Sequence, residues 1–315
     1  MPERKVADRL ALIAEGLYRF DTGYLRAGHT ACYIVVNNGH AAIVDCGVTA
    51  TAEPLLGALE QTGISLDSIE WVVPTHVHLD HAGGAGALMK MLPHAKLGVH
   101  PSGKDHLVDP SRLETGVRAL YGDAFFEREY APVTPVSEDR IVTFDDNTSL
   151  TLGSLALPIM HTPGHAWHQL GVIDPRSQTL MAGDAFGAGY PELAKTDQPM
   201  LVPVTPPPQF NPEAYRKTLD RIVREGIQQV APGHFPLIRD VPAAAARLEA
   251  MMDEGLEAAL QADSCEALEQ ALLDRWSKWL ADPEQRALFE QLYGKDIWLT
   301  AEGVWRWRCK QKEAS

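Results

Sequence analysis

The sequence predicts an α+β protein in which two mixed β-sheets are flanked by helices, with a helical extension at the C-terminus. Three observations support this class. Strand-like and helix-like segments alternate as far as residue 100, strand-like runs dominate residues 141–182, and helical patterns dominate from Pro242 onward. Many short strands with occasional helices are typical of two packed sheets with helices outside them. We therefore expect a main domain at residues 1–240 and a helical C-terminal extension at residues 241–315.

The first half of the chain contains most of the predicted strands. Apolar runs predict strands at residues 31–36, 41–44, 71–74, 97–100, 141–144, 149–152, 155–160, 170–173 and 179–182. Helices are predicted at residues 53–62 and 82–92. The stretch from Pro101 to Val136 is less regular, and we interpret it as an irregular segment.

A proline-rich segment separates these strands from the last part of the main domain. Pro199 to Pro212 cannot join a central sheet because proline lacks the backbone N–H, so we expect an extended surface loop. Asn211 as N-cap and Pro212 at the first helical position then predict a helix that reaches about Glu225. One further strand is predicted at residues 228–231.

The C-terminal extension is predicted to contain three helices. Two cover residues 242–261 and 264–280, and the third begins at Pro283 and ends near Gly294, because glycine commonly ends a helix. In the second helix an apolar residue recurs at every fourth position and forms one stripe: Leu268, Leu272, Trp276 and Leu280. We expect this stripe to pack on the main domain, and a homodimer contact or a lid remain alternatives.

Composition and charge exclude several classes of protein. Asp and Glu number 42 against 28 Lys and Arg, so the field of the protein would repel nucleic acid and anionic membranes. Neither Met1 to Leu10 nor any later stretch is apolar and long enough to act as a leader or to cross a bilayer, and we expect a cytoplasmic protein. The four cysteines lack a CxxC pair and are expected to be buried free thiols: Cys32, Cys46, Cys265 and Cys309.

The run HVHLDH at residues 76–81 is the most informative part of the chain. Imidazole nitrogen and carboxylate oxygen are the ligands that borderline divalent metals prefer, and four donors exceed what one tetrahedral ion takes from a single loop. His76 and His78 are two residues apart and would point in opposite directions on a strand, so they must lie on a turn. The run therefore predicts a centre for two metal ions.

Three further donors follow strand-like runs that end in glycine. They are His165 in HTPGH, Asp184 in MAGD and His234 in APGH. Loops at strand ends commonly carry function, and glycine lets the backbone bend sharply there. With the first run they supply five histidines and two aspartates, enough for two ions if one carboxylate bridges them: His76, His78, Asp80, His81, His165, Asp184 and His234.

This ordered set resembles the metallo-β-lactamase-fold superfamily of metallohydrolases over residues from about 15 to 240. The segment HTPGHA is similar to the hydroxyacylglutathione hydrolase (glyoxalase II-like) branch, and HPSGKDHLVDPSRL with TPPPQF resembles a poorly characterised bacterial and archaeal subgroup of it. The resemblance implies an αββα sandwich as the catalytic domain. It also implies a first metal on His76, His78 and His165, a second on Asp80, His81 and His234, and Asp184 as the bridge.

The resulting prediction is a dinuclear metal-dependent hydrolase of a small molecule. Two divalent ions, zinc first and iron or manganese as alternatives, would hold a bridging hydroxide that attacks the carbonyl of an ester, thioester or lactone. Asp80 is the expected catalytic residue, because it can position the nucleophile and shuttle its proton. A mononuclear iron oxygenase similar to persulfide dioxygenases, and a regulatory or effector protein with an incidental hydrolase site, are the alternatives.

Other residues are expected to support this centre. Asp45 can orient a ligand histidine or stabilise a turn, and we expect His161 and His168 to form hydrogen bonds around the ligands. Aromatic and apolar residues of the two irregular segments would line a substrate cleft or pack in the core: Tyr121, Phe125, Phe126, Tyr130, Met200 and Phe210. Three cations can meet an anionic substrate group or remain solvated: Lys104, Arg112 and Arg118.

Overall fold

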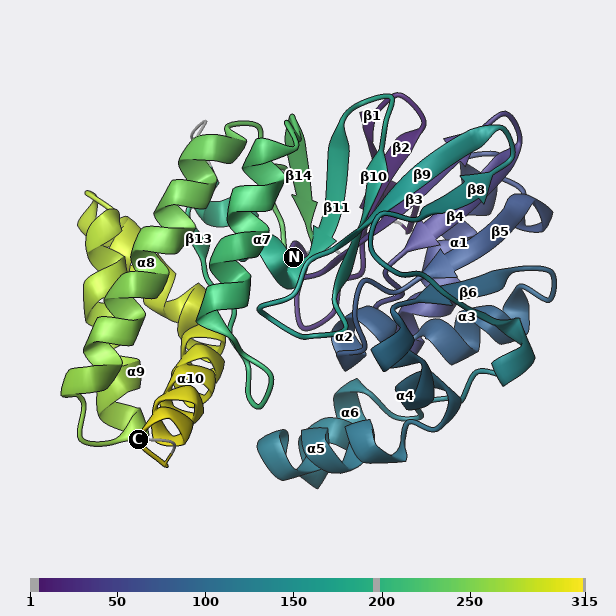
Figure 1. Ribbon diagram of the computed structural model, residues 1–315. Helices are drawn as coiled ribbons and strands as arrows, with labels where there is room; N and C mark the ends of the chain where they lie inside the picture. Colours follow the sequence, from purple (N-terminus) through teal and green to yellow (C-terminus); the bar gives the residue numbers. More distant parts are fainter. Residues whose placement is uncertain (1–5, 195–198, 314–315) are drawn as a thin grey trace. The chain divides into compact units, whose positions relative to one another are not determined.

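The computed structural model describes residues 6–194 and 199–313 (Figure 1). The chain divides into two compact units. The first contains the chain up to His161 and returns for residues 168–183, and the second contains residues 162–167 and the chain from Asp184 onward.

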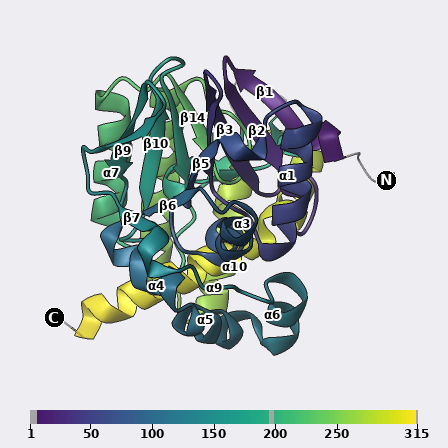
Figure 2. The same ribbon diagram turned by 90° about the vertical axis from the view of Figure 1, so that its right-hand side faces the viewer.

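A seven-stranded mixed sheet forms the centre of the first unit, with its strands in chain order (Figure 2). The strands are β1 (Leu10–Ala14), β2 (Leu17–Asp21), β3 (Ala31–Asn37), β4 (His40–Val44), β5 (Ile69–Val73), β6 (Lys96–Val99) and β7 (Ile141–Thr143). Strands β1 to β4 pair antiparallel and β4 to β7 pair parallel. Each parallel pair needs a crossover, which α1 (Ala52–Gln61) provides before β5, and α2 (Leu79–Ala82) with α3 (Ala85–Met91) before β6.

Helices α1 and α3 bury their apolar faces against this sheet. Leu55 on α1 and Leu88 on α3 are fully buried in one cluster with Ile34 and Ile43 of the sheet. Successive side chains of a strand point to opposite faces, and Tyr33 on the other face of β3 is buried as well. The central strands are therefore covered on both sides, and each fully buried leucine contributes about 1.5–3 kcal/mol.

A second, antiparallel sheet completes the first unit. It contains β8 (Ser149–Leu152), β9 (Leu155–His161), β10 (Leu170–Asp174) and β11 (Thr179–Gly183). Side chains tie the two sheets together, because Asn37 Nδ2 donates to the Leu152 carbonyl at 3.1 Å and Trp71 Nε1 donates to the Thr151 carbonyl at 3.0 Å. The predicted strands of this part of the chain are confirmed.

Parts of the first unit differ from the sequence prediction. The stretch interpreted as irregular contains three helices, α4 (Lys104–Val108), α5 (Ser111–Tyr121) and α6 (Asp123–Glu129), so that interpretation was wrong. No residue of α5 is fully buried, and its apolar residues Leu113 and Val117 are only partly buried. Strands β1 and β2 were not predicted, and β1 contains no buried residue.

The second unit combines short strands with long helices. It contains β12 (Ala188–Gly189), β13 (Leu201–Val202), α7 (Pro212–Arg224), β14 (Gln229–Pro232), α8 (Val241–Gln261), α9 (Cys265–Trp276) and α10 (Pro283–Glu313). Asn211 caps α7 as predicted, since its Oδ1 accepts from the Ala214 backbone N–H at 3.0 Å. Helices α8, α9 and α10 pack against one another and form the predicted C-terminal extension (Figure 1).

The long helix α10 does not end near Gly294 as predicted. It continues to Glu313, because buried residues recur at helical spacing beyond the glycine: Ile297, Ala301 and Val304. Their burial outweighs the roughly 1 kcal/mol that glycine costs inside a helix.

The stripe predicted on α9 packs on α8. Leu268, Leu272 and Trp276 are buried, and Trp276 Nε1 donates to the Met251 carbonyl at 3.1 Å. Leu280 lies beyond the end of α9 at Trp276, so the helix is shorter than predicted.

The prediction of an extended surface loop from Pro199 to Pro212 is wrong for its first part, because residues 199–206 are buried. Three of these eight residues, Pro199, Pro203 and Pro206, lack the backbone N–H, and Leu201 and Val202 are paired with β12. A segment with few unmatched donors can be buried at low cost.

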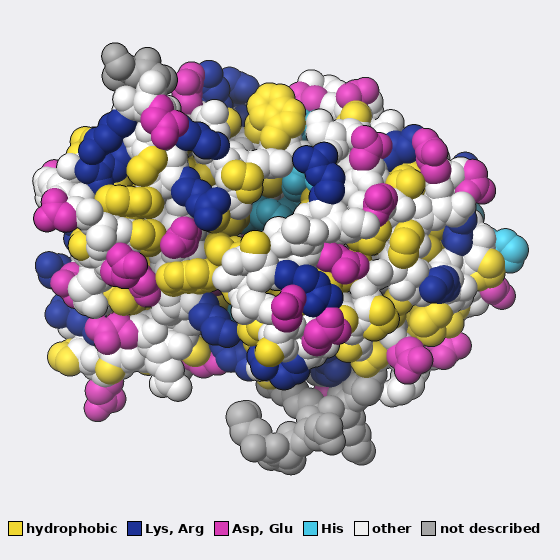
Figure 3. All heavy atoms as spheres, turned by 90° about the horizontal axis from the view of Figure 1, so that it is seen from below, with side chains coloured by type: hydrophobic (Ala, Val, Ile, Leu, Met, Phe, Trp, Pro, Cys, Tyr) yellow, Lys and Arg dark blue, Asp and Glu magenta, His cyan; other side chains and the backbone are white. Residues whose placement is uncertain are grey.

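The surface and the cysteines add two observations. On the face shown in Figure 3, acidic and basic side chains are intermixed. Among the described residues, no helix is both long and apolar enough to span a membrane. Cys32 and Cys46 are buried as predicted, whereas Cys265 and Cys309 are only partly buried.

Candidate metal centre

The first group of donors lies where β5 leads into α2. His76 and His78 lie on the bend between these elements, and His78 is the extended N-cap of α2, as the prediction of a turn required. His76 Nε2 and His78 Nδ1 are 3.0 Å apart. One residue into α2, Asp80 Oδ2 lies 3.5 Å from His81 Nε2. Two pairs of donor atoms are thus formed within six residues of the chain.

Asp45 orients His81 from the end of β4. His81 Nδ1 donates to Asp45 Oδ2 at 3.0 Å, and Thr75 donates to Oδ1 through its backbone N–H at 2.7 Å and its hydroxyl at 2.8 Å. The carboxyl is 1% exposed. Because Nδ1 carries the proton in this bond, Nε2 keeps its lone pair for a metal. Of the two roles considered for Asp45, the structure shows the contact with a predicted ligand histidine.

The second unit carries the other three donors. His165 lies in the short segment 162–167, Asp184 follows β11, and His234 follows β14. His165 Nε2 is 3.5 Å from Asp184 Oδ2, and His234 Nε2 is 3.6 Å from Asp184 Oδ1. His165 Nδ1 donates to the Val204 carbonyl at 2.8 Å, which again leaves Nε2 for a metal. Each oxygen of Asp184 therefore faces a different imidazole.

These distances suit divalent metal ions. Donor atoms on a tetrahedral ion with bonds of about 2.0–2.1 Å lie about 3.3 Å apart. The imidazole-carboxylate separations of 3.5, 3.5 and 3.6 Å are close to that edge and longer than the usual 2.7–3.2 Å of an N–H···O hydrogen bond. Four of the seven predicted donors belong to the first unit and three to the second. Within each unit, the paired donors have the chemistry and the spacing of metal ligands.

His168 contacts the ligands through its ring. Its ring centroid is 6.4 Å from that of His76 and 6.2 Å from that of His78, and it is 4% exposed. Its buried Nδ1 has no hydrogen-bond partner among the described residues, so a packing contact replaces the predicted hydrogen bond. Burial, followed by the nearby His78, lowers the pKa of His168 to about 3. His161 stacks on His100, with ring centroids 4.5 Å apart.

This buried imidazole should make the metal-free protein sensitive to acid. The unfolded chain binds a proton at His168 near pH 6.5, and the folded chain only near pH 3. Between these values the unfolded state holds the extra proton, so stability falls as the pH falls, by about 1.4 kcal/mol per pH unit. We expect His168→Gln to remove that slope in urea unfolding between pH 6 and 4. The exposed His94→Gln variant is the control, and equal slopes in the two variants would contradict the prediction.

Two tyrosines of the first unit lie near Asp80. Tyr24 Oη donates to Tyr130 Oη at 2.6 Å, and both rings are buried with Phe126. Burial first, and then the negative charge of Asp80, raise the pKa of both phenols, so both remain neutral hydrogen-bond donors. The sequence analysis left Tyr130 open between a substrate cleft and the core, and it missed Tyr24, which lies in a loop without a recognisable motif.

The other residues that were predicted to contact a substrate lie either in the core or at the surface. Met200 and Phe210 are buried, whereas Tyr121 and Phe125 are half-buried. The cations are at the surface: Lys104 pairs with Glu138 at 2.7 Å, Arg118 pairs with Glu127 at 2.6 Å, and Arg112 is exposed. The interpretation of solvated charges suits all three.

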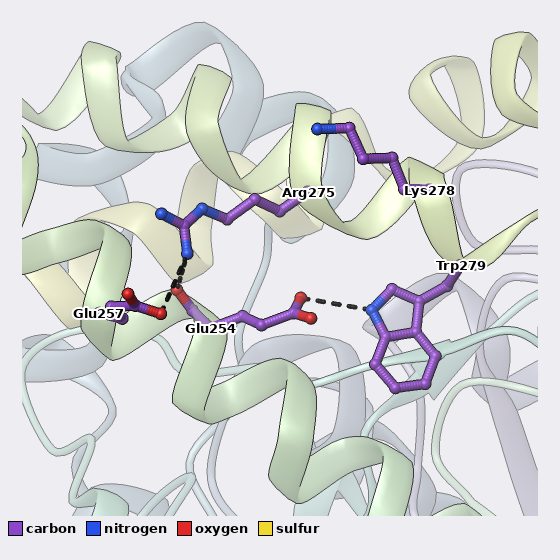
Figure 4. Close-up of a pocket in the computed structure, with 5 residues that line it drawn as sticks. All are labelled: Glu254, Glu257, Arg275, Lys278 and Trp279. Atoms are coloured by element: carbon purple, nitrogen blue, oxygen red, sulfur yellow. Dashed lines mark hydrogen bonds and ion pairs between the residues drawn. The ribbon is translucent and has the colours of Figure 1, made fainter.

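A surface cleft of about 560 Å³ lies in the helical part of the second unit (Figure 4). It is lined by Glu254, Glu257, Arg275, Lys278 and Trp279. Trp279 Nε1 donates to Glu254 Oε2 at 3.3 Å, and Arg275 lies 3.5 Å from Glu257. None of the five is a predicted metal donor, so we do not assign this cleft to the metal centre.

A mixed sheet and an antiparallel sheet with flanking helices, together with this set of donors, are typical of a metallohydrolase fold, and the family comparison agrees. The model of the metallo-beta-lactamase superfamily matches residues 25–234. The chain therefore belongs to the metallo-beta-lactamase superfamily, most of whose members are hydrolases. The predicted fold and family are both confirmed.

Individual relatives and one solved structure show which members of the superfamily this chain is similar to. The chain is 27% identical to a hydroxyacylglutathione hydrolase of Aeromonas salmonicida, over 50% of this chain and 46% of the relative. It is 22% identical to the acyl-coenzyme A thioesterase MBLAC2 of Homo sapiens, over 71% of this chain and 79% of the relative. The crystal structure of a metallo-beta-lactamase family protein from Thermus thermophilus matches 96% of this chain and 95% of its own, with 19% identity and a TM-score of 0.69. The chain spans less than two thirds of the first curated relatives it matches, 63, 61 and 46% of their lengths.

Proposed function

We propose that the protein is a dinuclear metal-dependent hydrolase of small-molecule thioesters or esters. The seven predicted donors would hold two divalent ions, with zinc as the first choice. The observation that carries this proposal is Asp184, which presents one carboxylate oxygen to His165 and the other to His234. A carboxylate with its two oxygens facing different imidazoles is suited to bridge two ions. Family membership and the order of the donors along the chain support the same assignment.

When bound, the two ions lower the pKa of a water molecule towards neutrality and polarise the carbonyl under attack. The residues of the chain then have separate tasks. Asp80 is the one to move a proton, because its side chain is 20% exposed while that of His81 beside it is fully buried. It accepts the proton of the attacking water and passes it to the leaving group. Asp45 and the Val204 carbonyl hold the two imidazoles in the correct tautomer.

The chemistry around Asp80 favours a thioester. Tyr24 and Tyr130 share one O–H···O bond, so one of their two hydroxyl protons remains to donate to a substrate oxygen. A thiol has an ordinary pKa of about 8.5, so a thiolate leaves with little help from an acid. Two relatives, named as an acyl-coenzyme A thioesterase and a hydroxyacylglutathione hydrolase, support this class.

Metal analysis combined with an activity screen tests the proposal. Untagged protein is assayed for metal content, and the same preparation is tested on thioesters, esters, lactones and persulfides. We expect about two ions per chain, thioester cleavage that is lost on complete chelation, and recovery when zinc is added. Undiminished hydrolysis after chelation would overturn the proposal. One iron per chain with thiol-dependent oxygen consumption would instead support the iron oxygenase.

A further inference from the structure

The buried proline-rich segment, residues 199–206, contacts the backbone of α10 directly. Thr300 Oγ1 on α10 donates to the Pro203 carbonyl at 3.1 Å, and Thr205 Oγ1 donates to the Thr300 carbonyl at 3.3 Å. Both threonines are 1% exposed. A Cβ placed on Gly303 would lie only 1.6 Å from the Thr205 carbonyl oxygen. Helix and segment are therefore in contact without an intervening side chain.

The same segment holds a proposed metal donor. Val204 lies between the two residues that α10 fixes, and its carbonyl accepts the Nδ1–H of His165 at 2.8 Å. This bond sets both the tautomer and the ring orientation of His165. A displacement of the Val204 carbonyl would therefore rotate the Nε2 atom of His165 away from Asp184.

A second path connects α10 with the loop that follows Asp184. Tyr293 on α10 accepts from the Tyr190 backbone N–H at 3.0 Å and donates to the Met200 carbonyl at 2.9 Å. β12 of the Asp184 loop pairs with β13 of the proline-rich segment. The loop that begins at Asp184 and the carbonyl that holds His165 are thus fixed by one helix, within the second unit.

We infer that α10 positions the metal donors His165 and Asp184, with Thr300, Gly303 and Tyr293 as positioning residues. The inference rests on the proposed function, because it takes these donors as ligands. The family model ends at residue 234, so α10 lies outside the part that defines the family. Helix α10 therefore does more than pack against α9. It also holds the predicted metal donors of the second unit in position.

Two glycine substitutions on the same helix form a matched test. Gly303→Ala places a methyl group against the Thr205 carbonyl, whereas Gly294→Ala meets no atom within 4 Å. We expect Gly303→Ala to weaken zinc binding about 10- to 100-fold in competition with a chromophoric chelator, the usual range when support of a ligand is lost. The visible absorption of the cobalt-substituted protein should change as well. Gly294→Ala should match the wild type in both measurements.

Thr300→Val and Thr300→Ser keep the test decisive if Gly303→Ala does not fold. Valine removes the hydroxyl that donates to Pro203, and serine restores it, so we expect weaker zinc binding only in the valine variant. In metal-free protein, the ¹⁵N shifts of His165 should report a proton on Nδ1 in the wild type and a mixture of tautomers in Thr300→Val.

The outcomes separate the inference from the proposed function. If Thr300→Val lowers thermal stability while zinc affinity, the cobalt spectrum and the His165 tautomer all match the wild type, α10 is only a packing element and the inference is wrong. If the wild type binds metal and the variants respond as expected but no ester or thioester is cleaved, the proposed function fails while the positioning role holds.

Discussion

Asp184→Ala should lower kcat/KM for the best substrate at least about 1,000-fold, which corresponds to about 4 kcal/mol of lost transition-state stabilisation. The side chain faces both His165 and His234 at 3.5 and 3.6 Å, so its loss affects both proposed ions. We expect metal content to fall below one ion per chain in the same preparation. Steady-state kinetics and metal analysis of one sample measure both effects.

The control for this prediction is Asp220→Ala on α7. Asp220 is exposed, whereas Asp184 is 3% exposed. The control should keep both activity and metal content. Asp184→Asn retains the volume of the side chain and removes its charge, so it separates charge from shape. Full metal content in Asp184→Ala would show that the carboxylate does not bridge.

Asp45→Ala should destabilise the metal-free protein by about 3 kcal/mol or more, because three buried donors would lose their acceptor at a cost of about 1–3 kcal/mol each. The carboxylate accepts from the backbone and hydroxyl of Thr75 and from His81, and none of these donors can turn to water. Denaturant unfolding of metal-free protein measures this loss. The exposed Asp67→Ala variant should unfold like the wild type.

Asp45→Asn distinguishes stability from metal binding. Asn tolerates the left-handed backbone conformation that Asp45 adopts, with φ of 63°, and keeps most of the side-chain volume. It accepts less strongly from His81, so we expect zinc affinity to fall 10- to 100-fold while most of the stability remains. Unchanged affinity would show that Asp45 serves the fold and not the metal centre.

Residue type and spacing predicted a candidate set of metal donors because seven imidazoles and carboxylates occur in this order after strand-like runs, although any one of them alone could be structural. They also predicted the central strands, whose burial on both faces leaves continuous apolar runs. The same reasoning missed α5, in which no residue is fully buried, and ended α10 at Gly294 because the apolar residues beyond it were not weighed against the glycine.

Other features depend on contacts that no local pattern encodes. The support of His165 is the backbone carbonyl of Val204, and a carbonyl carries no signal of residue type. The bond between Tyr24 and Tyr130 joins residues 106 positions apart. Spacing along the chain predicts which atoms can bind a metal, whereas their orientation depends on long-range packing.

The chain leaves the first compact unit for only residues 162–167, between β9 and β10, and this short excursion carries His165. Its anchor at Val204 is synthesised later, and the helix that fixes this anchor later still. During synthesis, domains generally fold from the N-terminus onward. It follows that the donors at residues 76–81 emerge from the ribosome long before His165 is fixed, so the proposed metal centre would form as one of the last events in the biogenesis of the protein. A chain that stops before α10 would then hold only part of the proposed metal donors in position, and it would lack the proposed hydrolase activity.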